Sequence, residues 1–97
     1  MKLIWSPLAI DRIAEIASYI ARDNPMAAEK WIYDAFNRVG QLARFPRSGR
    51  QVPEASRVDI RELIWKNYRI IYRVNAEEVA LLTVRHTKEV LPLEDLT

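Results

Sequence analysis

Arginine and lysine side chains gather in one part of the sequence, between residue 44 and residue 88. This segment holds ten basic residues and five acidic ones, although the whole chain has a net charge of only +2. A guanidinium group binds a phosphate or a carboxylate through two parallel hydrogen bonds. The segment could therefore form an anion-binding surface, although the solvated rim of a sheet would show the same excess of charge.

His86 is the only histidine of the chain, and histidine is the side chain best suited to acid–base catalysis near neutral pH. It could act as a general acid or base if a suitable partner group lay within hydrogen-bond reach. The structural alternative is a histidine that hydrogen-bonds to the edge of a sheet. Because the sequence pattern shows no carboxylate partner for His86, we favour this structural role.

Most cofactor chemistry lacks the residues that it needs. The chain has no cysteine, which excludes disulfides, thiol nucleophiles and cysteine metal sites, and a single histidine excludes a multi-histidine metal centre. No Walker or dinucleotide-type glycine loop is present. We therefore expect neither a metal nor a cofactor. The N-terminus lacks a signal-peptide pattern and no segment approaches the roughly 20 apolar residues of a membrane span, so we expect a cytoplasmic protein.

The first half of the chain has the pattern of a strand followed by two helices. We expect the strand over residues 2–5 and the helices over residues 7–22 and 25–43, opened by Ser6-Pro7 and Asn24-Pro25. Serine and asparagine are favoured N-caps, and proline fits the first helical position. Apolar residues recur every three or four positions in both segments, which predicts a helical hairpin that buries one stripe of each helix.

Beyond a connector over residues 44–56, the apolar period shifts to two. This period predicts strands over residues 58–65, 68–74 and 79–86, joined by short turns into an antiparallel meander. The last strand is apolar on both faces at its centre, so we expect it in the interior of the sheet. Strict alternation would divide its residues between the two faces of the sheet. One face would carry Ala80, Leu82, Val84 and His86, and the other face would carry Val79, Leu81, Thr83 and Arg85.

The order of the elements predicts a two-layer α+β domain, β-α-α-β-β-β, with the helical hairpin on one face of a mainly antiparallel sheet. The opposite face then needs a cover or a ligand. Tyr68 and Tyr72 are interpreted as core or interface residues of the middle strand. At 97 residues, the chain is expected to form a single domain over residues 1–97.

Four segments in the correct order resemble the ParE/RelE superfamily, whose members are toxins of type II toxin–antitoxin systems. The segments are residues 16–28 between the helices, the FP-x-x-G connector within residues 42–50, the Tyr68-Arg69-Ile70-Ile71-Tyr72-Arg73 strand that follows Arg61, and the strand end Leu82-Thr83-Val84-Arg85-His86. The resemblance covers nearly the whole chain. The chain is thus identified as a member of this superfamily, closer to its ParE branch.

The RelE branch of the superfamily cleaves messenger RNA on the ribosome, by attack of a ribose 2′-hydroxyl on the neighbouring phosphate. In this alternative, His86 would serve as acid or base, with Arg61 and Arg85 at the phosphate. The chain departs from the RelE pattern because residues 87–97 contain no tyrosine, and because it has no lysine-rich catalytic strand. We therefore lean against an enzyme and keep a ribosome-dependent mRNA endonuclease as the alternative.

The ParE branch is associated with inhibition of DNA gyrase through binding, so the resemblance implies a growth-arresting gyrase inhibitor. It also implies a cognate antitoxin whose acidic, amphipathic C-terminal segment wraps the toxin. Such an antitoxin would make any contact with DNA indirect for this chain. We expect the residues that contact the target or the antitoxin to come from the basic half of the chain: Arg61, Trp65, Arg69, Arg73, Arg85 and Lys88.

Overall fold

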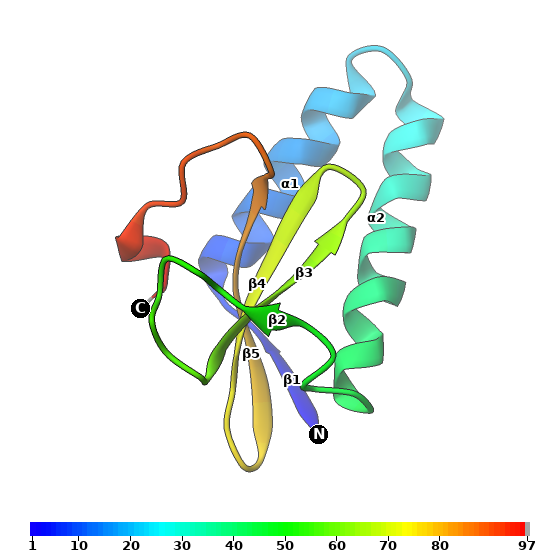
Figure 1. Cartoon of the computed structure of the whole chain (residues 1–97). Coiled ribbons are helices and arrows are strands. Elements are labelled where there is room, and N and C mark those ends of the chain that lie inside the picture. The colour runs from blue at the N-terminus through cyan, green and yellow to red at the C-terminus, as the bar shows by residue number, and fades with distance from the viewer. Residues whose placement is uncertain (97) are drawn as a thin grey trace.

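The computed structural model describes residues 1–96 of the chain, and it has the predicted α+β architecture (Figure 1). A strand and two helices are followed by a connector and a three-stranded meander. The elements in chain order are β1 (Lys2–Trp5), α1 (Pro7–Ala21), α2 (Pro25–Gly40), a 3-10 turn (Gln41–Ala43), β2 (Arg50–Gln51), β3 (Ile60–Trp65), β4 (Tyr68–Val74), β5 (Glu78–His86) and a second 3-10 turn (Leu93–Leu96).

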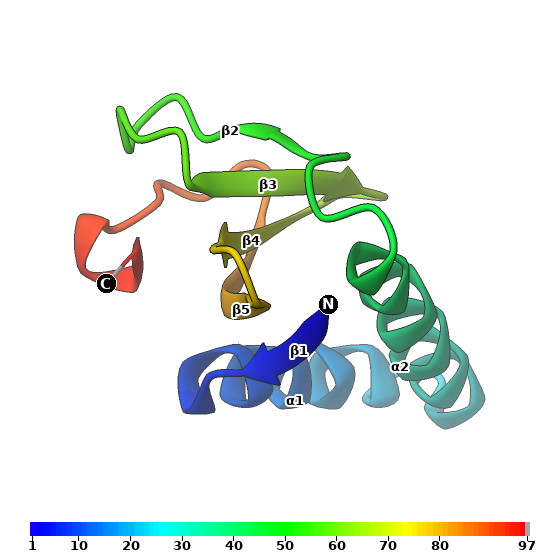
Figure 2. The same ribbon diagram turned by 90° about the horizontal axis from the view of Figure 1, so that it is seen from below.

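The two helices begin where their capping residues predict. Ser6 accepts a hydrogen bond from the backbone N–H of Ala9 at 3.0 Å, and Asn24 accepts one from Ala27 at 3.1 Å. These side chains satisfy backbone donors that the first helical turn leaves without a partner. The helices run side by side as a hairpin against one face of the sheet, as Figure 2 shows from below. No helix within residues 1–96 is long and apolar enough to cross a membrane.

The five strands form one sheet in the order β1-β5-β4-β3-β2. β5 pairs in parallel with β1 and in antiparallel with β4, which confirms the prediction that it is an interior strand. The meander also has nearly the predicted bounds, except that β3 begins at Ile60 instead of Val58, whose side chain is exposed. The two-residue strand β2 was not predicted, and it pairs Arg50 with Glu62.

A β-bulge in β5 corrects the predicted alternation of its side chains. Ile71 of β4 pairs with Thr83, but the next residue of β4, Tyr72, pairs with Leu81, so Leu82 is the extra residue. A bulge of this kind breaks the period of two, because two residues of one strand face one residue of the other. As a result Val84 joins Val79 and Leu81 in the core beneath the helices, while Leu82 packs on the opposite face.

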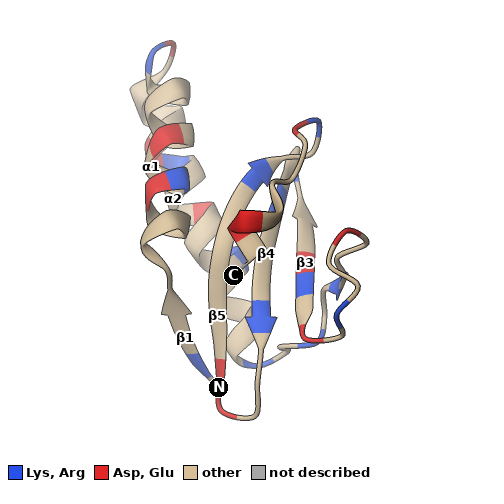
Figure 3. Cartoon of the chain, turned by 90° about the vertical axis from the view of Figure 1, so that its left-hand side faces the viewer, with Lys and Arg blue, Asp and Glu red and all other residues tan. Residues whose placement is uncertain are grey.

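The face of the sheet that looks away from the helices is covered by the chain itself. Leu91 and Leu96 of the C-terminal segment pack with Ile71 and Leu82 of the sheet, and Val52 of the connector joins them. Figure 3 shows this segment in front of β4 and β5, with the helices to the left of the sheet and partly behind it. A cover or a ligand was predicted for this face, and residues 89–96, which no sequence pattern marked for this role, provide the cover.

Candidate functional site

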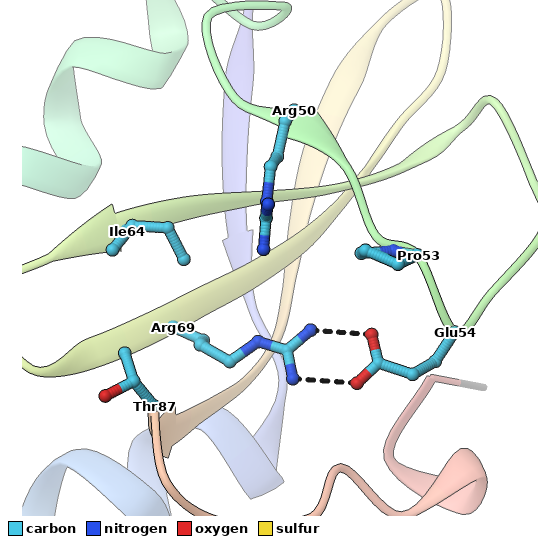
Figure 4. A pocket seen from close by; sticks show the side chains of 6 residues that line it. All are labelled: Arg50, Pro53, Glu54, Ile64, Arg69 and Thr87. Atoms are coloured by element: carbon cyan, nitrogen blue, oxygen red, sulfur yellow. Dashed lines mark hydrogen bonds and ion pairs between the residues drawn. The ribbon is translucent and has the colours of Figure 1, made fainter.

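Four charged side chains form a continuous chain of ion pairs on the face of the sheet away from the helices. Arg69 donates from Nε to Glu62 at 2.6 Å and from Nη1 and Nη2 to Glu54, each at 2.8 Å (Figure 4). Arg50 donates from Nε to the other oxygen of Glu62 at 2.7 Å. Glu62 and Arg69 are 1% and 8% exposed. A buried carboxylate of this kind needs cationic partners, because burial alone disfavours its charge.

An open pocket of about 530 Å³ lies above this chain of ion pairs, bounded by β2, β3, β4 and the residue that follows β5. The side chain of Arg50 is 61% exposed there, and its Nη atoms have no hydrogen-bond partner among residues 1–96. A guanidinium edge of this kind suits a carboxylate or a phosphate. The six residues that line the pocket are drawn in Figure 4: Arg50, Pro53, Glu54, Ile64, Arg69 and Thr87.

The bidentate contact with Arg69 lowers the pKa of Glu54 to about 2, from an ordinary 4.5. Because the folded state binds this proton less tightly than the unfolded chain, Glu54 stabilises the fold above pH 4.5. That contribution is lost as the pH falls from 4.5 towards 2. We expect urea denaturation to give a smaller acid-induced loss of stability over this range for Glu54→Gln than for the wild type. The substitution Glu29→Gln, on the exposed side of α2, should leave the wild-type pH dependence unchanged.

Arg61 lies on the other face of the sheet and holds the connector in place. Its Nη1 donates to the backbone carbonyl of Gly49 at 2.8 Å, while the hydroxyl of Tyr72 accepts from the backbone N–H of the same glycine at 2.9 Å. The Nε atom of Arg61 is buried without a hydrogen-bond partner among the described residues. The structure therefore places this arginine, a candidate for target binding, in contact with the chain's own backbone.

Arg85 faces the C-terminal segment and fixes it to the sheet. Its Nε and Nη2 contact one carboxylate oxygen of Asp95 at 2.8 and 2.7 Å, and its Nη1 contacts Glu89 at 3.1 Å. The hydroxyl of Thr83 lies 3.3 Å from the same oxygen of Asp95. Asp95 is only 6% exposed, so this arginine compensates a buried charge in the cover of the sheet.

His86 lies on the helix side of the sheet, at one end of a second pocket of about 230 Å³. Its ring stands edge-on to Tyr68 with 5.6 Å between centroids, and its Nδ1 accepts a hydrogen bond from the backbone N–H of Lys88 at 3.1 Å. The partner of Nδ1 thus belongs to the turn that follows β5, and the role of His86 stays a prediction. The pocket also contains residues from α1 and from beyond β5, namely Glu15, Ile16, Tyr19 and Glu89.

The carboxylates near His86 were missed by the sequence analysis. Glu15 is on α1, about seventy residues earlier in the chain, and only the packing of α1 against β5 brings it close. Glu89 was visible in the sequence, three residues after His86. Its approach depends on the turn after β5, in which the backbone N–H of His86 donates to Glu89 at 3.2 Å.

The three residues of the alternative catalytic set do not share one site. Arg61 pairs across the sheet with Tyr72 and His86 pairs with Tyr68, four residues away along β4. At about 3.3 Å per residue, this separates the two positions by about 13 Å. Arg85 points to the opposite face, towards Asp95.

The other residues expected to contact a partner are also divided between the faces. Trp65 packs beside Trp31 on the helix side, with Lys66 4.9 Å above its ring. Arg73 is partly exposed and shares the face of Arg69 at the other end of β4. Lys88 is exposed after the end of β5. Partner binding by these residues stays a prediction, and the structure adds Arg50 to them.

Comparisons with known proteins agree on one family. The family model described as "ParE toxin of type II toxin-antitoxin system, parDE" matches residues 3–91. A protein of Sinorhizobium fredii (strain NBRC 101917 / NGR234), named "Putative toxin Y4kP", is 34% identical over 93 residues, and the match covers 94% of this chain and 93% of that protein. A solved structure described as "Chromosomal ParDE TA system from P. aeruginosa" matches with a TM-score of 0.74 and 22% identity, over 89% of this chain and 95% of that one. At 22% identity, this last match shows that the two chains share a fold.

Proposed function

The chain belongs to the ParE toxin family of type II toxin–antitoxin systems, and from this premise we propose that it arrests growth by binding and inhibiting DNA gyrase. The inhibition is a binding event and not a cleavage reaction. A cognate antitoxin neutralises the toxin by covering part of its surface. RNA cleavage would need His86, the chain's only histidine, as an acid or base, whereas inhibition by binding would not. The surroundings of His86 therefore distinguish the two functions.

The observation that carries the proposal is the charge of the pocket around His86. Glu15 and Glu89 line this pocket, and no lysine or arginine is among its six described lining residues. An RNA-cleaving site needs cations at the reacting phosphate, whereas here the two carboxylates are themselves paired with the nearby arginines Arg12 and Arg85. The nearest arginine in sequence, Arg85, is bound both to Asp95 on the opposite face and to Glu89 at this pocket, so its charge is already paired. This pocket therefore favours a protein ligand over RNA.

Supercoiling by purified gyrase tests the proposal. We expect the purified, antitoxin-free chain to reduce supercoiling of a relaxed plasmid in a dose-dependent manner, and His86→Ala to retain most of this effect. Boiled protein is the control for non-specific effects. Unchanged supercoiling, together with no accumulation of cleaved plasmid, would contradict gyrase inhibition.

One observation favours the alternative, a ribosome-dependent mRNA endonuclease. Tyr68 and Glu89 stand beside His86, so an acid–base set is present even though the cations are absent from the pocket. In vitro translation followed by primer extension distinguishes the two functions. Cleavage of ribosome-bound mRNA that disappears in His86→Ala would establish the endonuclease, and intact mRNA with inhibited gyrase would exclude it.

The antitoxin is proposed to place an acidic, amphipathic segment at the pocket of Figure 4. Arg50 offers its Nη atoms to a carboxylate there, and the side chain of Ile64 is 49% exposed beside it as an apolar contact. Induction of the chain alone should arrest growth, and co-expression of the cognate antitoxin should restore it. Normal growth upon induction would instead indicate a non-toxic member of the family that only binds its antitoxin.

A further inference from the structure

The pocket around His86 is lined by two carboxylates and by no lysine or arginine among the described residues, although Glu15 and Glu89 are each paired with an arginine outside its lining. It lies between α1 and the ends of β4 and β5, where Glu15 and Tyr19 share one face of the helix at a spacing of four residues. Glu89 closes it from beyond β5 and is held by Arg85 and by the backbone of His86. The two carboxylates therefore reach this pocket from opposite sides.

Aromatic rings line the pocket, and several of their polar atoms have no hydrogen-bond partner among the described residues. Within residues 1–96, neither the hydroxyl of Tyr68 nor that of Tyr19 forms a hydrogen bond, and the Nε2 atom of His86 has no hydrogen-bond partner. Burial raises the pKa of the Tyr68 hydroxyl above its ordinary value. Aromatic faces and carboxylates together attract a cation that has hydrogen-bond donors.

The chain already shows such a contact with one of these rings. The guanidinium carbon of Arg22 lies 5.7 Å from the centroid of the Tyr19 ring, which is within the range of a cation–π interaction. Glu15 is bound to Arg12 at 3.0 Å, and a carboxylate can accept further hydrogen bonds. The side chains that line the pocket are thus suited to guanidinium in both their aromatic and their acidic members.

We propose that this pocket receives an arginine side chain of the protein that the toxin inhibits. The volume of about 230 Å³ is below the range of about 300–1,000 Å³ that is usual for small-molecule sites, which favours a single side chain. Arginine is also enriched among the residues that dominate binding at protein interfaces. The inference rests on the proposed function for the identity of the partner, and on the pocket alone for the chemistry of the ligand.

The antitoxin is the less suitable occupant of this pocket. Its segment is proposed to be acidic, and Glu15 and Glu89 would repel it. The same segment is attracted to the pocket at Arg50, on the face of the sheet away from the helices. The two pockets thus assign the two partners to different surfaces of the toxin, according to the sign of their charge.

A direct titration tests the chemistry of the ligand without any partner protein. The probe is N-acetyl-arginine methylamide, and its control is the citrulline analogue, which has a similar shape but no charge. We expect the arginine probe to cause saturable NMR shifts at the rings of Tyr19, Tyr68 and His86, and the citrulline probe to cause much smaller ones. Equal shifts with both probes, or no saturable shift with arginine, would overturn the cation site.

Charge variants then connect the pocket to inhibition. Glu15→Lys should weaken probe binding, and should raise the concentration needed for half-inhibition of gyrase by about tenfold, because a like charge replaces an attractive one. Glu29→Lys makes the same change on an exposed face of α2, outside the lining of the pocket, and should have an effect below about twofold. Circular dichroism establishes that both variants fold.

The two proposals fail in different ways in these experiments. Probe binding with no inhibition of gyrase by the wild-type chain would reject gyrase as the partner and leave the cation site supported. Inhibition that Glu15→Lys leaves unchanged, although the probe no longer binds, would overturn the assignment of the arginine to the inhibited protein.

Discussion

Replacement of Arg69 by alanine is expected to lower the free energy of unfolding by about 3–5 kcal/mol, because it leaves a buried charge without its main partner. Glu62 is 1% exposed and would keep only Arg50, whose side chain is largely in solvent. Glu54 would lose both of its bonds to Arg69 as well. Urea denaturation at pH 7 measures the change, and thermal unfolding should show a midpoint lower by more than about 10 °C.

Two further variants distinguish the effect of the buried ion pair on stability from the effect of an exposed charge. Arg50→Ala removes the exposed partner of Glu62 and should cost less than about 1 kcal/mol, since most of its side chain is solvated. Arg69→Lys keeps the charge, but an ammonium group cannot hydrogen-bond to both Glu62 and Glu54 as the planar guanidinium does. Its loss of unfolding free energy should therefore lie between those of Arg50→Ala and Arg69→Ala. A loss below about 1 kcal/mol for Arg69→Ala would contradict the structural role and would favour the role in partner binding.

The elements of this fold could be predicted because each has a local cause in the sequence. Ser6-Pro7 and Asn24-Pro25 determine where the helices begin, and the bounds of β4 follow from the alternation of its apolar residues. The interior place of β5 followed from its apolar centre, since a strand that is covered on both faces needs apolar residues on both.

The parts that could not be predicted depend on pairing between distant segments. The bulge at Leu82 arises from the register of β5 against β4, and no local pattern marks it. The ion pairs of Arg69 require Glu54, which belongs to the connector and meets β4 only after the sheet forms. The alternation of side chains along β4 places Arg69 on the face opposite Tyr68, but it gives no information on whether solvent or a carboxylate meets the guanidinium there.

Gly49→Ala is expected to lower the free energy of unfolding by about 2–4 kcal/mol, because a Cβ has no room and the crowded atoms are held in place. An added Cβ would lie 2.5 Å from the backbone oxygen of Glu62 and 2.5 Å from the hydroxyl of Tyr72. Moving the connector away would break its bonds to Tyr72 and Arg61. The matched control is Gly40→Ala, where a Cβ meets nothing within 4 Å and should be neutral or stabilise the end of α2 by up to about 1 kcal/mol. If urea denaturation gave the two variants equal stability, the connector would not be held as tightly against β3 and β4 as these contacts imply.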